Sequence, residues 1–361
     1  MMKKILSICL LAIQFTGYCQ IPSYKVIAYY TGNEATIKQY PIDKLTHIIH
    51  SFLKLQNDTL TFANDEQRST VQSLMSLKKT YPQLKIMVSI GGWSGCAPCS
   101  DLFASAEHRS TFAKTTVALF KEYGIDGLDL DWEYPAIEGF PGHKYSLADK
   151  DNFTQLVTTL RNEMGQKYLL SFAAGGFDQF LQQSIDWDAV MPNLDFVNLM
   201  TYDLVGGYST VTGHHTPLAG YMPGQQSTKN CVDWLINKKV AANKLIIGAA
   251  FYARVWEQVA AGENNGLYQS GKFLQGVNYK NFETYFAPDS GFVYHWDKKA
   301  KAPFQYNATK KLFATFDDEK SIAAKTAFIR KNKLGGIMFW ELSLDKPQNG
   351  LVDAISSGLN K

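Results

Sequence analysis

The segment Asp126-Gly-Leu-Asp-Leu-Asp-Trp-Glu-Tyr-Pro135 places acidic side chains at alternate positions. Side chains alternate between the two faces of a strand, so Asp129 and Asp131 share one face and Glu133 follows them. Like charges this close repel, and partly buried carboxylates are costly unless one of them holds a proton. Such a cluster raises the pKa of at least one member, which makes a glutamic acid a competent general acid near neutral pH. We therefore predict acid catalysis by Glu133.

A calcium site and a solvated acidic loop are the structural alternatives for this segment. Calcium favours a flexible loop that contributes amide and backbone oxygen ligands. The acids here alternate instead with Leu128 and Leu130, which have the pattern of a strand packed beneath helices. The alternation favours the catalytic interpretation.

Short runs rich in β-branched and apolar residues recur along the chain between segments of helix length. Near-continuous apolar strands that alternate with helices predict a parallel sheet buried on both faces, and eight of them close a barrel. We predict strands at Val26–Tyr30, His47–Phe52, Lys85–Ile90, Ile125–Asp131, Tyr168–Ala173, Phe196–Met200, Leu245–Ala250 and Gly336–Phe339. Helices are predicted at Glu66–Thr80, Ala106–Tyr123, Ala148–Met164, Gln226–Lys238 and Asp318–Asn332. The expected fold class is α/β, a TIM (β/α)8 barrel.

The interval between Ala250 and Asp318 is too long and too rich in Tyr, Phe, Gly and Asn for a plain connection. We predict a small α+β insertion domain there, at residues 256–312, between strand seven and helix eight, the last predicted helix. The catalytic barrel as a whole is expected to span residues 21–361.

Residues 1–20 have the pattern of a secretory signal peptide. Lys3 and Lys4 form its positive end, and the apolar stretch from Ile5 is too short to span a bilayer. We expect cleavage near Cys19; lipidation of Cys19 is less expected because a bulky Tyr18 precedes it. The prediction is a secreted protein, periplasmic or extracellular, with no membrane attachment in its mature form.

The charge of the chain excludes some partners. Of the formal net charge of +3, two charges come from Lys3 and Lys4, and no basic run occurs elsewhere. Electrostatics therefore gives no reason to expect nucleic acid or an anionic membrane as a partner. A monomer is expected.

The cysteines and histidines are interpreted as structural. Cys96 and Cys99 have redox-motif spacing, but a Gly-rich loop surrounds them, so a local disulfide is the better interpretation for an exported chain. Cys231 is predicted to be a buried free thiol on a helix. His214 and His215 are adjacent, and the side chains of adjacent residues rarely bind the same metal ion. No third metal ligand is evident in the sequence. We expect loop histidines, no metal and no cofactor.

The acidic segment resembles the signature of glycoside hydrolase family 18, the chitinases. Three further segments match that family in order and position: Ser89-Ile-Gly-Gly-Trp93, Met200-Thr-Tyr-Asp203 and Gly335-Gly-Ile-Met-Phe-Trp-Glu341. Tyr252-Ala-Arg-Val-Trp256 resembles the family's usual entry to an insertion domain. The resemblance runs from about Tyr24 to the C-terminus.

The resemblance implies roles for the catalytic residues. Glu133 would protonate the departing glycosidic oxygen, and the substrate's own 2-acetamido group would attack the anomeric carbon, as is exceptional among retaining glycosidases. Asp131 would bind the acetamido N–H, Asp129 would share a proton with Asp131, and Tyr202 would hold the acetamido oxygen. Glu133 would then act as base, so that configuration is retained.

The resemblance also implies a substrate-binding set: Asp203, Trp340, Trp93, Tyr134, Met200, Tyr208, Arg254 and Tyr29. Trp340 would form the floor beneath the sugar, and Trp93 either stacks on a leaving-side sugar or packs its loop. Tyr208 stands where many relatives carry a Trp. Arg254 either binds substrate or anchors the insertion through an ion pair.

Other residues near these motifs have structural interpretations. Tyr29 and Phe52 point from the first two predicted strands, and such residues are more often barrel core than sugar contacts. Ser89, Gly91 and Gly92 are interpreted as architectural, because small residues allow a tight turn.

Three functions are compatible with these residues. The first is a chitinase, with chitin or chito-oligosaccharides as substrate. The second is an endo-β-N-acetylglucosaminidase acting on N-glycans, which needs the same acetamido chemistry. The third is a chitin-binding lectin, but lectins of this fold usually lose the acid that Glu133 supplies here. The predicted insertion favours a deep groove and the chitinase.

Overall fold

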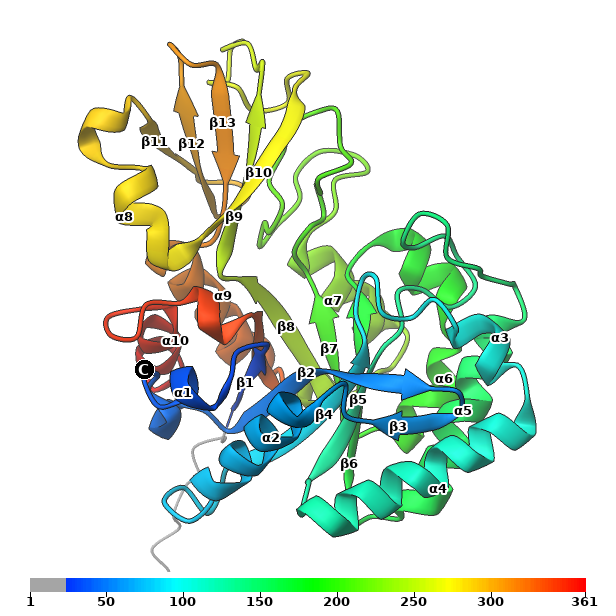
Figure 1. Cartoon of the computed structure of the whole chain (residues 1–361). Coiled ribbons are helices and arrows are strands. Elements are labelled where there is room, and N and C mark those ends of the chain that lie inside the picture. The colour runs from blue at the N-terminus through cyan, green and yellow to red at the C-terminus, as the bar shows by residue number, and fades with distance from the viewer. Residues whose placement is uncertain (1–23) are drawn as a thin grey trace, which may run out of the picture.

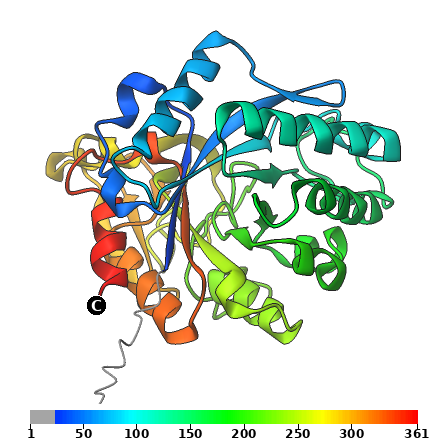
Figure 2. The same cartoon turned by 90° about the horizontal axis from the view of Figure 1, so that it is seen from below.

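The computed structural model describes residues 24–361 and contains a closed barrel of eight parallel strands. The strands are β1 (Lys25–Tyr30), β2 (His47–Gln56), β4 (Lys85–Gly91), β5 (Gly127–Asp131), β6 (Leu169–Gly175), β7 (Phe196–Met200), β8 (Leu245–Ala250) and β14 (Gly336–Trp340). β1 pairs with both β2 and β14, which closes the ring. Figure 2 shows the helices arranged around these strands. The predicted TIM barrel is confirmed, whereas the predicted signal peptide and Cys19 lie outside the described residues.

The helices of the barrel follow the predicted pattern, except that the prediction omitted the last helix, α10 (Leu351–Leu359). The main helices are α2 (Asp65–Leu77), α4 (Ala106–Tyr123), α5 (Asp149–Met164), α7 (Thr228–Asn237), α9 (Glu319–Asn332) and α10. The prediction that the helix near Asp318 is the last one is wrong, because α9 precedes β14 and α10 follows it. The periodic Leu351, Val352, Ile355 and Leu359 of α10 are all buried. Among residues 24–361, no helix combines the length and apolar character that a membrane span requires.

Local capping sets where the helices begin and end. The side chain of Asn64 accepts a hydrogen bond from the Gln67 N–H at the start of α2. Gly124 ends α4 in the left-handed region, with a φ of 76°, which a residue without Cβ adopts at little cost.

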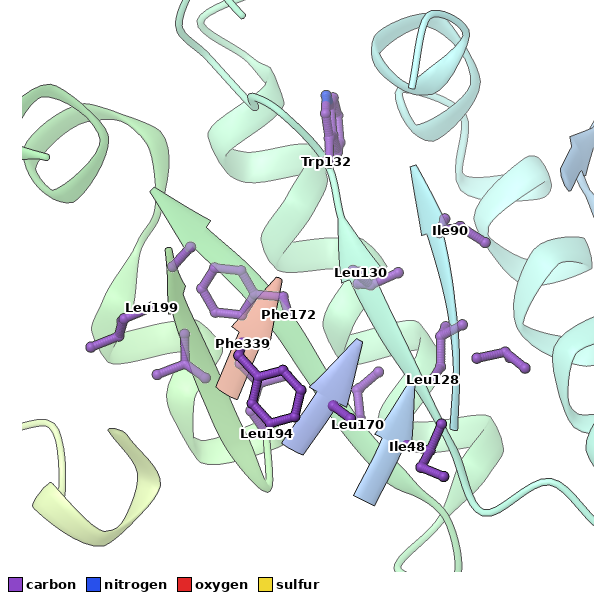
Figure 3. Packing of buried hydrophobic residues seen from close by; sticks show 14 of the residues in the cluster. Ile48, Ile90, Leu128, Leu130, Trp132, Leu170, Phe172, Leu194, Leu199 and Phe339 are labelled. Carbon is purple, nitrogen blue, oxygen red and sulfur yellow. The ribbon is translucent and has the colours of Figure 1, made fainter. Parts of the chain in front are cut away.

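The core has two shells that follow the alternation of the strands. Outward-facing residues such as Leu128, Leu130 and Phe172 pack against the helices (Figure 3). Inward-facing residues such as Ile49 and Met338 fill the barrel itself. Leu128 and Leu130 therefore turn outward as predicted, and the acids between them face the interior.

The interval after β8 forms a second sheet. Its strands are β9 (Tyr252–Glu257), β10 (Lys272–Asn278), β11 (Val293–Asp297), β12 (Ala302–Asn307) and β13 (Leu312–Thr315), in the antiparallel order β10-β9-β13-β12-β11. A short helix, α8 (Phe282–Tyr285), follows β10. Figure 1 shows this insertion sheet standing beyond the strand ends of the barrel. The sheet extends past the expected bounds of 256–312 at both ends. At its start only Phe251 separates β8 from β9, and at its end β13 continues to Thr315.

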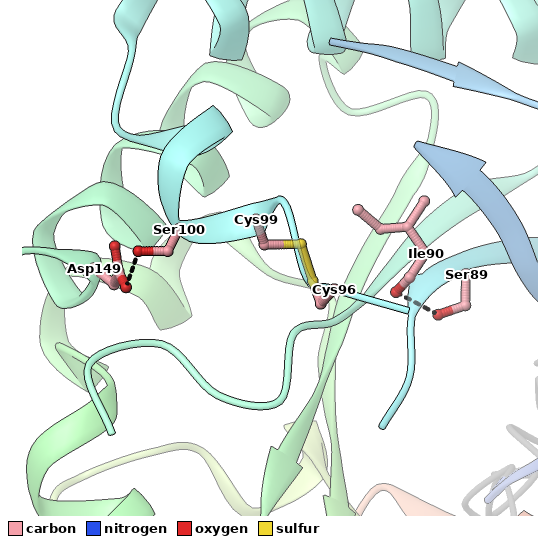
Figure 4. Close-up of a disulfide and its surroundings, with 6 residues drawn as sticks. All are labelled: Ser89, Ile90, Cys96, Cys99, Ser100 and Asp149. Carbon is pink, nitrogen blue, oxygen red and sulfur yellow. Dashed lines mark hydrogen bonds between the residues drawn. A yellow bond between two sulfur atoms is a disulfide. The ribbon is translucent and has the colours of Figure 1, made fainter. Parts of the chain in front are cut away.

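A disulfide braces the loop that follows β4. Cys96 and Cys99 are bonded, with their Cα atoms 5.1 Å apart, and α3 (Cys99–Phe103) begins at the second cysteine (Figure 4). The Ser100 hydroxyl donates to Asp149 at the start of α5, at 2.8 Å. The predicted local disulfide is confirmed, and Cys231 is a buried free cysteine in α7, as predicted.

Candidate active site

Asp129 lies in the middle of β5, and four side chains from β1, β4, β6 and β7 donate hydrogen bonds to it. The donors are Tyr29 Oη at 2.8 Å, Ser89 Oγ at 3.0 Å, Ser171 Oγ at 2.6 Å and Asn198 Nδ2 at 3.1 Å. Burial raises the pKa of Asp129, and these four hydrogen bonds oppose that rise. The barrel interior thus satisfies this one carboxylate completely.

Asp131 lies in very different surroundings, two residues further along the same face. Its Oδ1 atom is buried without a hydrogen-bond partner among residues 24–361. Burial, together with the Glu133 and Asp129 charges, raises the pKa of Asp131 well above its usual value. No hydrogen bond joins Asp131 to Asp129 in the part of the chain that the structure describes, so the predicted shared proton stays a prediction.

Glu133 is half-buried just beyond the end of β5. Burial is the main cause that raises its pKa to about 7; the Asp203 charge adds to it and a hydrogen bond with Tyr134 opposes it. A carboxyl group with this pKa is partly protonated at neutral pH, which is what a general acid requires.

Tyr202 and Asp203 follow β7, which β6 alone separates from β5. Tyr202 is 9% exposed, and its hydroxyl lies 3.8 Å from the Met338 sulfur. Asp203 accepts two hydrogen bonds from Arg254, from Nε at 2.7 Å and from Nη2 at 2.6 Å, and its Oδ1 lies 3.4 Å from His215 Nδ1. Burial opposes ionisation of Asp203, but the nearby His215 and Arg254 lower its pKa overall.

Arg254 therefore forms the ion pair that was one of its two predicted roles. It lies on β9, and its guanidinium lies 5.0 Å from the centre of the Tyr252 ring. The pair with Asp203 connects the insertion sheet to the loop that carries Tyr202.

Trp340 ends β14 and lies among aromatic rings. Its ring stacks on Phe52 at 5.7 Å and packs against Tyr29 at 5.8 Å. Gly92 must lack a side chain here, because an added Cβ would lie 2.5 Å from the Phe52 ring. Gly92 therefore has an architectural role, because it leaves room for the Phe52 ring. Phe52 and Tyr29 hold the Trp340 ring in place, as expected for a ring that forms the floor of a sugar-binding site.

A second aromatic group surrounds Trp93. Its ring lies 6.2 Å from Tyr134, 5.8 Å from Phe140 and 6.1 Å from Tyr208. Trp93 keeps 37% of its surface exposed and Tyr208 keeps 72%. Trp93 thus packs against its neighbours and still offers a face to solvent.

Two of the predicted substrate-binding residues, Tyr29 and Met200, lie in the interior shell of the barrel, and one residue interpreted as architectural, Ser89, binds Asp129. Tyr29 is 1% exposed, so its ring has no face for a sugar; its hydroxyl binds Asp129 instead. Ser89 was interpreted as architectural, but its hydroxyl also donates to Asp129. Met200 is nearly buried beside Tyr202 in the interior shell.

Sequence reasoning missed several residues that support the site. Ser171 and Asn198 are polar residues at inward positions of apolar strands, a signal that could have identified them. His215 was expected to be an ordinary loop histidine, yet it is buried against Asp203, while His214 turns the other way to Asp297 at 3.2 Å. No cluster able to hold a metal ion occurs among residues 24–361.

The fold is a (β/α)8 barrel, and the half-buried Glu133 at its mouth has the raised pKa that a general acid requires. The profile of glycosyl hydrolases family 18 matches residues 25–345. The chain belongs to this family, as its four motifs predicted.

Several known proteins and solved structures are similar to this chain over most of its length. Chitinase A1 of Niallia circulans is 33% identical over 318 residues, which cover 79% of this chain and 45% of that protein. The chain thus spans less than half the length of this relative. Chitinase ChiA74 from Bacillus thuringiensis has a TM-score of 0.87 at 27% identity, covering 94% of this chain and 70% of that one. A family 18 N-acetylglucosaminidase from Paenibacillus barengoltzii has a TM-score of 0.83 at 33% identity, covering 93% and 100%.

Proposed function

We propose that this chain is a secreted chitinase that hydrolyses β-1,4 linkages between N-acetylglucosamine units and retains the anomeric configuration. The family and the chitinases among its relatives support the reaction class. The observation that carries the proposal is Glu133, whose pKa of about 7 suits a group that must first donate and later accept a proton.

The first step of the proposed reaction is cleavage assisted by the substrate. Glu133 protonates the glycosidic oxygen while the acetamido oxygen of the same sugar attacks the anomeric carbon, giving a cyclic oxazolinium ion. Tyr202 holds that oxygen in line for attack. Asp131 accepts a hydrogen bond from the acetamido N–H and stabilises the positive charge.

The second step is hydrolysis of this intermediate. Glu133 is now a carboxylate and removes a proton from a water that attacks the anomeric carbon, so the two inversions restore the original configuration. Trp340 supports the apolar face of the reacting sugar from below. Asp203, held by Arg254, stays ionised at the edge of the site.

Export to the periplasm or the extracellular space belongs to the same proposal. The signal-like segment at residues 1–20 and the Cys96–Cys99 disulfide support it, because disulfides persist in oxidising compartments.

Release of single sugars from chain ends is a second candidate activity. It is favoured by the similarity to the N-acetylglucosaminidase from Paenibacillus barengoltzii, which this chain covers over its whole length. Product length separates the two candidates, since a chitinase that cuts within a chain releases dimers and longer fragments.

The test uses the purified protein and its Glu133→Gln variant with a chitin hexamer and with a high-mannose glycopeptide, analysed by mass and anomeric form. Short β-anomeric products from the hexamer, absent with the variant, are the expected result. Only monomers would favour the second candidate. A released glycan with an untouched hexamer would indicate an N-glycan endoglycosidase, and binding without cleavage would indicate a lectin.

A further inference from the structure

A buried ion pair joins the start of α9 to the barrel, and the proposed mechanism does not use it. Lys325 of α9 and Asp317, which precedes that helix, are both fully buried, and Lys325 Nζ lies 2.6 Å from Asp317 Oδ2. Burial lowers the pKa of Lys325 and the Asp317 charge opposes this fall, so each charge depends on its partner. A buried ion pair often adds little stability over apolar residues of the same size. The pair is therefore better explained by what it holds in place.

The pair holds the backbone of β8. Lys325 Nζ donates to the Gly248 carbonyl at 3.2 Å, and Asp317 Oδ2 accepts from the Ala250 N–H at 3.0 Å. Ser321 Oγ donates to the other oxygen of Asp317, Oδ1, at 2.6 Å. Hydrogen bonds to charged groups are the strong ones, so β8 is fixed at two points two residues apart.

The pair also reaches the loop after β7, through Thr216. Lys325 Nζ donates to Thr216 Oγ1 at 2.6 Å. The one proton of this hydroxyl can go to Asp317 Oδ2 at 3.0 Å or to the Thr201 carbonyl at 3.3 Å. Thr201 directly precedes Tyr202. Thr216 therefore lies between the ion pair and the backbone that carries Tyr202.

Gly248 brings these contacts to the Tyr202 ring itself. Its N–H donates to Thr201 Oγ1 at 3.0 Å, and its carbonyl accepts from the same hydroxyl at 3.2 Å. A Cβ added to Gly248 would lie 2.9 Å from the Tyr202 ring. The glycine backbone thus packs directly against the ring, so a shift of β8 at this point would displace the Tyr202 hydroxyl.

We propose that Lys325 and Asp317 are positioning residues for Tyr202. They fix the Gly248 backbone and, through Thr216, the loop that carries Tyr202, and so hold its hydroxyl where it orients the acetamido oxygen. Both are fully buried, so they act through Tyr202 and not on the substrate. Misplacing a positioned group by about 1 Å can slow a reaction by about 10²-fold. This inference rests on the proposed function, which gives Tyr202 its role.

The experiment measures steady-state rates on the chitin hexamer for two variants, at a temperature at which circular dichroism shows them folded. Lys325→Met should lower kcat by about ten- to hundredfold and change KM by less than about twofold, because Tyr202 orients the attacking oxygen. Thr216→Val keeps the ion pair and the side-chain volume, so it remains informative if Lys325→Met does not fold. It should lower kcat by about three- to tenfold, the size of one hydrogen bond.

Combination with Tyr202→Phe separates positioning from a general loss of structure. Without the hydroxyl there is nothing left to misplace, so adding Lys325→Met or Thr216→Val to Tyr202→Phe should lower kcat by less than about twofold. If the losses simply multiply in the combined variants, the pair does not act through Tyr202 and the inference is wrong.

The matched control is Arg161→Met, which breaks a different ion pair. Arg161 Nη2 lies 2.7 Å from Asp195 Oδ2, and Asp195 directly precedes β7, whereas Tyr202 follows the opposite end of that strand. The control should lose stability and keep the wild-type kcat. An equal loss of kcat in the control would attribute the effect to lower stability in general and contradict the inference.

Failure of this inference and failure of the proposed function give different results. Wild-type kcat in both Lys325→Met and Thr216→Val would overturn the positioning role alone and leave the chitinase proposal intact. A fully active Tyr202→Phe would remove the proposed role of Tyr202 and this inference with it. A hexamer left uncut by the wild type would overturn the proposed function, on which the inference rests.

Discussion

Two groups of carboxylates face the same barrel mouth in opposite electrostatic states. At the end of β5, Asp131 lies close to the Glu133 charge, and burial raises the pKa of both carboxyl groups. After β7, Asp203 is paired with Arg254 beside His215, and its pKa is lowered. The side chains are chemically alike, so their neighbours decide which one stores a proton and which one keeps a charge.

The largest expected effect comes from removing the acid of the β5 group. Glu133→Gln keeps the shape of the side chain but cannot transfer a proton, so kcat should fall by about 10²–10⁴. Steady-state rates on a chitin hexamer measure this loss. Asp126→Asn is the matched control, because Asp126 begins the same segment yet is held by Lys78 at 2.7 Å. A comparable loss in the control would show that any charge change along the segment is damaging.

The next effect concerns the cation of the β7 group. Arg254→Met should leave Asp203 without its partner, so kcat/KM should fall by roughly tenfold and stability by about 1–3 kcal/mol, since an unpaired, partly buried charge is costly. Arg254→Lys should recover part of both losses, because one ammonium cannot replace two parallel hydrogen bonds. Thermal unfolding and hexamer kinetics are the measurements. A fully active Arg254→Met variant would show that the pair only anchors the insertion sheet.

A third effect follows from the raised pKa of Glu133. A carboxyl group whose pKa is higher when folded costs stability above its unfolded pKa, and the cost grows until pH passes the folded value of about 7. Glu133→Gln should therefore be more stable than the wild type at pH 8, by about 1–3 kcal/mol, and similar to it near pH 4. Denaturant unfolding at both pH values tests this. Equal stability at pH 8 would mean that Glu133 ionises without penalty.

The difference between the two groups explains what the sequence could predict. The β5 group is local: alternation along one strand places Asp129 and Asp131 inward, and the sequence shows it directly. The β7 group joins residues far apart in the chain. Whether Arg254 binds substrate or forms an anchoring ion pair could therefore be decided only once the structure showed Asp203 beside it. Tyr29 shows the same limit, since its binding to Asp129 depends on strands that only the closed barrel brings together.

The smallest effect links the two groups. Glu133 acts as an acid while it is protonated, so activity should decline as pH rises through its pKa. The Asp203 charge contributes to the raised pKa of Glu133, and Asp203→Asn removes it while freeing the positive charge of Arg254. Both changes favour the ionised form of Glu133, so the alkaline limb of the kcat/KM profile should move to lower pH. The shift should be below about one unit, because Asp203 is partly exposed and solvent screens it. An unchanged alkaline limb would mean that the two groups are not coupled through charge.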